Sequence, residues 1–141
     1  MFSYRHAFHA GNHADVLKHT TLIATLRHLM LKEPSITLVD THAGAGLYRL
    51  DGDYAEKGGE AADGIVKLMA ALRPATGEAA ASSPALDEYL DLIAGFNPSG
   101  SLRVYPGSPF VMQSLMRTES RDRLKLFELH PTDSRTLNAN I

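Results

Sequence analysis

The sequence contains no cysteine among its 141 residues, which excludes disulfide bonds and thiolate metal sites. It also lacks an apolar run of about 20 residues, the length that a membrane-spanning helix requires, and it shows no secretory signal. A basic excess is missing as well, because the formal net charge is −2, whereas domains that bind nucleic acid by bulk electrostatics usually carry one. With 44% hydrophobic residues, the composition predicts one compact domain, or part of one, in the cytoplasm.

Basic residues are concentrated at the N-terminal end. Residues 1–32 include four Lys or Arg side chains and five histidines, against the single acid Asp15. The close spacing of four of these histidines raises the question of a metal site: His6, His9, His13 and His19. No acidic or cysteine partner accompanies them at helical spacing, so we favour a role facing RNA or a cofactor and predict no metal.

The pattern from residue 12 to about residue 32 predicts a helix. Asn12 can cap its first turn, and Asp15 suits the positive N-terminal end of the helix dipole. Four apolar residues then recur at helical spacing: Val16, Ile23, Leu26 and Met30. Pro34 discourages helical geometry at the residue before it, which predicts the end of the helix.

Two short apolar segments read as buried parallel strands, residues 36–39 and 124–127. Asp40 follows the first strand and a turn with Gly44 and Gly46 comes next, while Glu128 ends the second strand. A helix is expected over residues 109–116. This alternation predicts an α/β fold with a parallel sheet.

A helical insertion of roughly 50 residues is expected between the two strands, with helices over residues 61–72 and 85–96 and low-complexity sequence between them. Such a length exceeds that of ordinary loops and predicts a small subdomain. We therefore divide the chain into residues 1–50 (helix, first strand and glycine turn), 51–100 (insertion) and 101–141 (continuation of the first part).

Two parallel strands cannot cover their own edges and faces, so the sheet is expected to be incomplete. Four apolar side chains of the strands are then expected to lack covering partners: Ile36, Leu38, Leu124 and Leu126. For this reason the chain alone is expected to be marginally stable.

The strand ends predict a ligand site. In open α/β sheets, glycines after one strand let a nucleoside-bearing ligand approach the backbone, and an acid after another accepts hydrogen bonds from ribose hydroxyls. Gly44, Gly46 and Glu128 fit these roles. Phe127 and Leu129 flank Glu128 in a segment that we expect to be buried, where an unpaired carboxylate is unfavourable and a ribose diol would be a suitable partner.

Four motifs together identify a family. They are residues 4–19 (Tyr-Arg-His-Ala-Phe-His-Ala-Gly-Asn-His-Ala-Asp-Val-Leu-Lys-His), 40–46 (Asp-Thr-His-Ala-Gly-Ala-Gly), 105–109 (Tyr-Pro-Gly-Ser-Pro) and 128–131 (Glu-Leu-His-Pro). The sequence closely resembles the RlmJ family of 23S ribosomal RNA adenine-N6 methyltransferases along its whole length, most loosely in the insertion. The resemblance implies a Rossmann-like class I methyltransferase fold with a small helical insertion, S-adenosylmethionine as cofactor, and an adenine of naked 23S ribosomal RNA as substrate.

The resemblance also assigns site residues. Those expected to bind the cofactor, with the residues of the glycine turn included, are Lys18, His19, Asp40, His42, Gly44, Gly46, Ser108 and Glu128. The resemblance also implies that Tyr4 approaches the target adenine. Arg5 lies outside this carry-over: by its chemistry it is either a solvated charge or a contact to a phosphate of the RNA, and we expect the phosphate contact. The Ser108 hydroxyl is also expected to cap the helix that follows it.

The family's catalytic Asp-Pro-Pro-Tyr motif does not occur in this sequence. The catalytic Asp is therefore expected beyond Ile141, and this chain alone is expected to be inactive. The full-length protein is expected to be a monomer. The sequence leaves open which adenine is modified, why the chain stops at residue 141, and what the insertion does.

Two other functions were weighed. One is a nonenzymatic RNA-binding remnant that keeps the basic N-terminus. The other is a nicotinamide-dependent oxidoreductase, which is disfavoured because Arg49 stands where the third glycine of the dinucleotide-binding fingerprint belongs.

Overall fold

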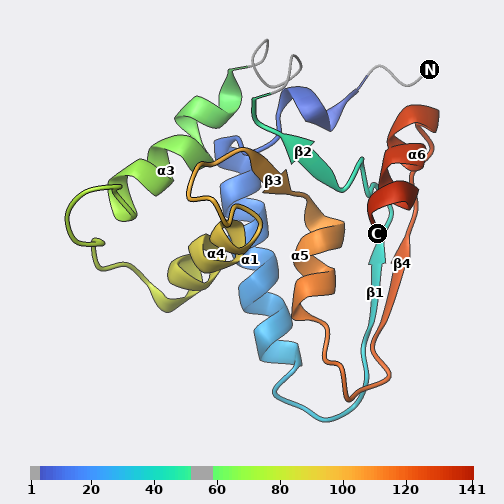
Figure 1. Ribbon diagram of the computed structural model, residues 1–141. Helices are drawn as coiled ribbons and strands as arrows, with labels where there is room; N and C mark the ends of the chain where they lie inside the picture. Colours follow the sequence, from blue (N-terminus) through green and yellow to red (C-terminus); the bar gives the residue numbers. More distant parts are fainter. Residues whose placement is uncertain (1–3, 52–58) are drawn as a thin grey trace.

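The computed structural model describes residues 4–51 and 59–141 (Figure 1). The N-terminal elements are η1 (His6–Phe8), α1 (His13–Leu29), β1 (Thr37–Asp40) and β2 (Leu47–Arg49). The insertion contributes η2 (Glu60–Asp63), α3 (Ile65–Leu72) and α4 (Pro84–Gly95). They are followed by β3 (Val104–Pro106), α5 (Ser108–Leu115), β4 (Arg123–Leu126) and α6 (Pro131–Asn140).

The predicted parallel pair is confirmed. β1 and β4 run parallel in a register that places Thr37 opposite Arg123 and Asp40 opposite Leu126. α5 connects the antiparallel pair to β4 and packs against both parallel strands. The carboxyl ends of β1 and β4 therefore lie side by side, below α6 in Figure 1.

A second pair of strands was not predicted. β2 and β3 pair antiparallel, with Tyr48 opposite Tyr105. The chain therefore leaves the glycine turn as β2 (Leu47–Arg49), and the insertion starts only after it. Each of these strands is three residues long, too short for an alternating pattern to be recognised.

The first helix is confirmed in type and at its start, where the Asn12 side chain accepts a hydrogen bond from the Asp15 backbone. It ends at Leu29, three residues earlier than expected. Pro84, Pro109 and Pro131 each stand in the first turn of a helix, where the missing backbone N–H has no intrahelical acceptor to lose.

The helices of the insertion share one hydrophobic core with the rest of the chain. Ile65, Tyr89 and Ile93 are fully buried and belong to the same cluster as Ile23 of α1 and Tyr105 of β3. At the start of the insertion, the Ile65 backbone donates a hydrogen bond to the Gly11 carbonyl. Residues 52–58 of the expected insertion lie outside the described part, and the three-part division of the chain stays a prediction.

The sheet is covered on one face only. The Ile36, Leu38, Leu124 and Leu126 side chains are half-buried against the core, so the expectation that these four lack covering partners is wrong. The opposite face is the uncovered one, since alternate residues of a strand point to opposite sides.

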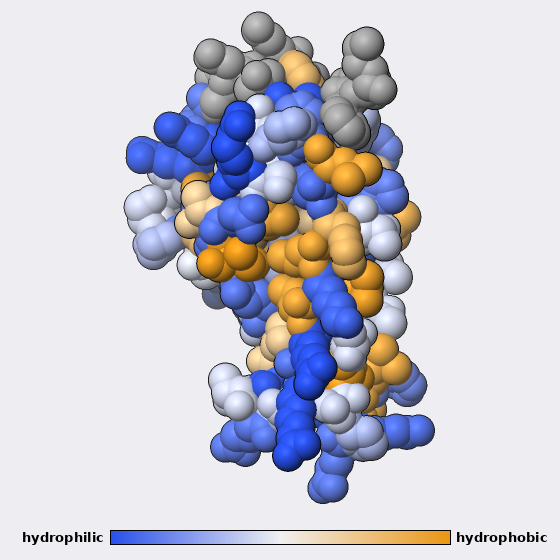
Figure 2. All heavy atoms as spheres, turned by 90° about the vertical axis from the view of Figure 1, so that its right-hand side faces the viewer, coloured by the Kyte–Doolittle hydropathy of each residue, from blue (hydrophilic) through white to orange (hydrophobic). Residues whose placement is uncertain are grey.

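Phe127 and Leu129 were expected to be buried, and this is also wrong, because they are 55% and 79% exposed. Val39 of β1 is exposed as well. Figure 2 shows this side of the molecule, on which hydrophobic side chains gather beside hydrophilic ones.

Within residues 4–51 and 59–141, no helix is long and apolar enough to cross a bilayer. In the same part of the chain, no three His, Asp or Glu side chains form a group that could hold a metal ion.

Candidate functional site

A pocket of about 450 Å³ lies at the carboxyl ends of β1 and β4. Its walls come from the N-terminal segment, α1, the glycine turn, the start of α5 and the start of α6. The lining residues are Tyr4, His6, Lys18, His19, Thr41, His42, Ala43, Gly44, Tyr48, Gly107, Ser108, Glu128, Leu129, His130 and Asp133. A volume of this size is typical of small-molecule sites.

The glycine turn brings backbone close to the pocket. Gly44 and Gly46 have φ angles of +68° and +87°, a region that glycine enters without strain. A Cβ added to Gly44 would lie 2.1 Å from the Tyr48 hydroxyl oxygen, and one added to Gly46 would lie 2.6 Å from the Phe110 ring. Gly44 lines the pocket, whereas Gly46 packs against α5 and α6 outside the lining.

Asp40 holds the pocket wall without lining it. One carboxylate oxygen accepts a hydrogen bond from the Ser108 hydroxyl, and the other accepts one from the His42 backbone at 3.1 Å. Gly107 is the N-cap of α5, and no side chain caps this helix. The expectation that Ser108 caps α5 is therefore wrong, because its hydroxyl is engaged with the end of β1 instead.

Glu128 is half-buried and fixed by two backbone groups. Its Oε1 accepts a hydrogen bond from the Gly44 N–H at 2.7 Å, and its Oε2 accepts one from the His130 N–H at 2.8 Å. The carboxylate therefore already has two backbone partners without any ligand. Each oxygen can accept further hydrogen bonds, so Glu128 joins the ends of β1 and β4 and still presents acceptors to the pocket.

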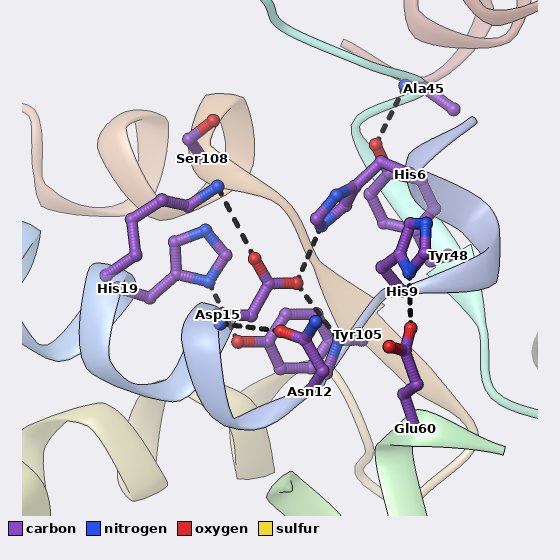
Figure 3. A network of polar contacts seen from close by, with 12 residues as sticks. His6, His9, Asn12, Asp15, His19, Ala45, Tyr48, Glu60, Tyr105 and Ser108 are labelled. Carbon is purple, nitrogen blue, oxygen red and sulfur yellow. Dashed lines mark hydrogen bonds and ion pairs between the residues drawn. The ribbon is translucent and has the colours of Figure 1, made fainter. Parts of the chain in front are cut away.

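Asp15 is the centre of a polar network in the N-terminal segment (Figure 3). It is 2% exposed, and its Oδ2 accepts hydrogen bonds from His6 Nε2 at 2.7 Å and from the Gly11 backbone at 3.0 Å. The Lys18 ammonium lies 3.4 Å from Oδ1. Burial acts to raise the pKa of Asp15, but the His6 hydrogen bond and nearby positive charge prevail and lower that pKa to about 2.

Tyr4 is attached to this network. Its hydroxyl lies 2.7 Å from His6 Nδ1, and its ring stacks on His9 with centroids 5.3 Å apart. His9 in turn pairs with Glu60 at the start of the insertion. Tyr4 is 64% exposed, although these neighbours set the position of its side chain.

His19 is fully buried in the wall between α1 and β3. Its Nδ1 lies 2.8 Å from the Tyr105 hydroxyl. Its Nε2 is the one buried side-chain nitrogen or oxygen within residues 4–51 and 59–141 that has no hydrogen-bond partner. Burial lowers the pKa of His19 to about 4, although Asp15 opposes this shift, so the imidazole is neutral near pH 7.

Arg5 does not line the pocket. It makes a two-pronged ion pair with the buried Asp133 of α6, with its Nη2 2.7 Å from Oδ1. This pair fastens the N-terminal segment to the C-terminal helix. His42 lies on the opposite rim, exposed, with its Nδ1 2.9 Å from the Thr41 hydroxyl.

The structure therefore brings most of the predicted residues into one pocket. Tyr4, Lys18, His19, His42, Gly44, Ser108 and Glu128 line it, whereas Asp40, Gly46 and Arg5 lie behind its walls. His6, for which we expected a role facing RNA or a cofactor, also lines it, whereas sequence reasoning missed Tyr48, His130 and Asp133. His130 stands inside one of the motifs quoted above, which is the signal that could have found it.

The fold and the pocket can now be compared with known proteins. Residues 33–141 match the model of the family described as "Ribosomal RNA large subunit methyltransferase D, RlmJ". This chain belongs to that family. The dinucleotide-binding alternative has no support in the RlmJ-family chain, because that fingerprint requires a helix directly after the glycines and β2 stands there.

Two curated relatives carry the name "Ribosomal RNA large subunit methyltransferase J". The protein from Escherichia coli (strain K12) is 45% identical over 134 residues, which are 94% of this chain and 44% of that protein. The protein from Haemophilus influenzae is 43% identical over 141 residues, which are 99% of this chain and 47% of that protein. The chain thus spans less than half the length of the curated relatives it matches.

A crystal structure from Legionella pneumophila, assigned to the family model DUF519, has a similar fold. It superposes with a TM-score of 0.74 at 35% sequence identity, covering 92% of this chain and 43% of the Legionella chain. This likeness supports the α/β arrangement of the RlmJ-family chain as a whole.

Proposed function

We propose that this chain is the cofactor-binding part of an S-adenosylmethionine-dependent methyltransferase that acts on the N6 amino group of an adenine in 23S ribosomal RNA. Family membership and the names of the two curated relatives support the activity. The observation that carries the proposal is Glu128, whose carboxylate at the end of β4 faces the glycine turn at the end of β1 inside one pocket.

The residues present fit this cofactor. The buried His19 Nε2 has no partner in the described protein and lines the pocket, which suits a polar ligand atom. A Cβ at Gly107 would lie 3.0 Å from the Gly46 carbonyl oxygen, so the backbone of this wall is close-packed. When bound, S-adenosylmethionine supplies an electrophilic methyl group.

The side chains of the pocket would hold and orient the cofactor. Glu128 would accept hydrogen bonds from the ribose hydroxyls, since it offers two oxygens already positioned by backbone N–H groups. Lys18 would attract an anionic group, and Asp40 would keep the Ser108 hydroxyl in place at the start of α5. Of the predicted cofactor residues, we propose direct contact for Lys18, His19, His42, Gly44, Ser108 and Glu128, with Asp40 and Gly46 supporting them.

The N-terminal segment would meet the RNA. The exposed Tyr4 ring would stack on the target base, a contact that aromatic side chains commonly make with unstacked bases. Arg5 is occupied by Asp133, so we propose that it fixes this segment rather than meeting a phosphate. The substrate would be naked 23S ribosomal RNA in the cytoplasm, and the full-length protein would act as a monomer.

The proposal includes a Rossmann-like class I fold, supported by the parallel β1 and β4 with α5 between them in the chain. It also includes a catalytic Asp that is supplied by sequence other than these 141 residues, which contain no Asp-Pro-Pro-Tyr motif. We therefore expect this chain alone to transfer no methyl group to RNA.

A fusion protein tests the activity directly. Residues 1–141 are joined to the part of the Escherichia coli relative that they do not cover, and transfer of labelled methyl from S-adenosylmethionine to protein-free 23S ribosomal RNA is measured. We expect N6-methyladenine in the RNA from the fusion and none from the chain alone. The fusion carrying Glu128→Ala serves as the control for the cofactor site.

Two outcomes would contradict the proposal. One is a folded fusion that binds S-adenosylmethionine but leaves 23S ribosomal RNA unmethylated under conditions in which the Escherichia coli relative methylates it. The other is methylation of the RNA by the 141-residue chain alone.

A further inference from the structure

A buried chain of hydrogen bonds ends at the pocket. The Tyr89 hydroxyl of α4 lies 2.8 Å from the Tyr105 hydroxyl of β3, which lies 2.8 Å from His19 Nδ1. All three residues are fully buried. Figure 3 shows His19 and Tyr105 at the inner side of the polar network, and the far ring nitrogen of His19 is the unpartnered one in the described part of the chain.

Counting donors decides how the protons are arranged. If Tyr89 donates to Tyr105 and Tyr105 donates to His19 Nδ1, both buried hydroxyl protons have acceptors. If instead His19 Nδ1–H donates to Tyr105, then Tyr105 donates to Tyr89, and the Tyr89 proton is left without an acceptor among the described residues. A buried donor without an acceptor is strongly unfavourable. The first arrangement leaves only the His19 Nε2–H unmet, and His19 lines the pocket, where a ligand atom can accept this proton. The second leaves the Tyr89 proton unmet away from the pocket and leaves Nε2 without a donor as well, so the first arrangement prevails.

We propose that Tyr105 is a positioning residue that holds neutral His19 as the tautomer protonated at Nε2, so that the cofactor pocket presents an N–H donor at this point. The inference rests on the proposed function for the identity of the ligand. Because the Lys18 ammonium lines the same pocket, the acceptor that fits here is an anionic oxygen, such as that of a carboxylate.

The ionisation states agree with this arrangement. Burial lowers the pKa of His19 to about 4, so the ring carries a single proton near pH 7 and its tautomer is well defined. Burial also raises the pKa values of Tyr89 and Tyr105, which keeps both hydroxyls protonated. Donation from Tyr89 further polarises the Tyr105 hydroxyl and strengthens it as a donor.

The tautomer can be measured without any ligand. Long-range ¹⁵N–¹H correlation spectra of the ¹⁵N-histidine-labelled chain at pH 7 distinguish a protonated from an unprotonated ring nitrogen. We expect His19 to carry its proton on Nε2 in the wild-type chain. A proton on Nδ1 would overturn the inference, and this measurement on the wild-type protein does not depend on any variant folding correctly.

Variants then test whether Tyr105 sets this state. Tyr105→Phe should let both tautomers appear, because Nδ1 loses its donor. Tyr48→Phe removes another buried hydroxyl of the same pocket that is bonded to Ala45 rather than to His19, and it should leave the tautomer unchanged. A folded Tyr105→Phe protein with the wild-type tautomer would also overturn the inference.

Calorimetric titration with S-adenosylmethionine separates this inference from the proposed function. Tyr105→Phe should weaken binding by roughly 10-fold, the size expected for one lost hydrogen bond. Tyr89→Phe leaves Tyr105 its acceptor, so His19 should keep the Nε2 tautomer in the spectra of this variant. Absence of binding by a wild-type chain whose His19 is protonated at Nε2 would contradict the proposed function and leave the tautomer assignment standing. Equal binding by the wild type and Tyr105→Phe would contradict the positioning role.

Discussion

His19 couples the pocket at the ends of β1 and β4 to acid stability. Its folded-state pKa, about 4, lies below the ordinary value of 6.5 because the buried imidazole is hard to charge. The unfolded chain therefore binds a proton first as the pH falls, and folding stability is lost between pH 6.5 and pH 4. Asp15 affects stability in a separate pH range. Its pKa is lowered from the ordinary value of 3.8 to about 2, so protonation of Asp15 removes folding stability only as the pH falls from 3.8 towards 2.

We expect the free energy of unfolding to fall by about 2 kcal/mol between pH 7 and pH 5 on account of His19. The measurement is chemical denaturation at several pH values, with His19→Gln as the comparison. The variant should show a flatter dependence on pH over this range. Parallel curves for the two proteins would mean that His19 is not the group responsible.

The exposed Tyr4 ring stacks on His9 at the pocket rim, where we propose that it contacts the target base. We therefore expect Tyr4 to serve methyl transfer rather than cofactor binding. In the fusion protein, Tyr4→Ala should lower RNA methylation by about 10-fold, within the range known for base stacking on aromatic side chains. The affinity for S-adenosylmethionine should stay within roughly 2-fold of the wild type on the same grounds. Tyr4→Phe keeps the ring and should retain most activity. If cofactor affinity fell together with methylation, Tyr4 would have a structural role instead.

At this scale, motif resemblance predicted residues such as His19, Ser108 and Glu128, and the structure brings them together. Asp15 was interpreted only as a favourable charge at a helix start. Its role as a buried acceptor for His6 and Lys18 depends on contacts that form when the N-terminal segment folds back, and no local pattern contains them.

Among the elements, the insertion meets the rest of the molecule most tightly at Gly64. A Cβ there would lie 2.1 Å from the Gly11 carbonyl oxygen and 2.6 Å from the Asn12 carbonyl carbon. Both contacts are with backbone, so they cannot be relieved by rotating a side chain. This close approach joins the start of α3 to the loop that leads into α1.

Gly64→Ala should therefore destabilise the protein by about 1 to 3 kcal/mol, the usual cost of overpacking. Gly95→Ala is the matched control, because nothing lies within 4 Å of a Cβ at that position, and it should be neutral or slightly stabilising, as alanine favours helices. Thermal denaturation compares the two. Equal midpoints would show that the insertion is not docked against residues 11–12 as described.

Elements with strong local signals could be predicted. The helices carry caps, prolines in the first turn and apolar periodicity, and β1 and β4 are short apolar runs at turn boundaries. β2 and β3 could not be found in this way, because each has three residues and the insertion separates the two partners in the sequence.

For the molecule as a whole, the two parallel strands are open on one face, where Val39, Phe127 and Leu129 are exposed. Each of the two curated relatives is more than twice as long as the segment that it shares with this chain. The sequence predicted an α/β fold with adjacent parallel strands, and the structure confirms this. The sequence did not predict which side chains of the strands the core covers. Alternation along a strand places residues on two faces, but it does not say which face is packed.

We propose that the pocket at the ends of β1 and β4 binds S-adenosylmethionine through Glu128. Isothermal titration calorimetry with S-adenosylmethionine tests it most directly, with NAD⁺ as the competing nucleotide and Glu119→Ala as a control carboxylate outside the pocket. We predict binding of S-adenosylmethionine but not of NAD⁺, and a loss of about 10-fold or more in Glu128→Ala, as expected for charge-assisted hydrogen bonds. An unchanged dissociation constant in Glu128→Ala, or equal binding of NAD⁺, would contradict the account.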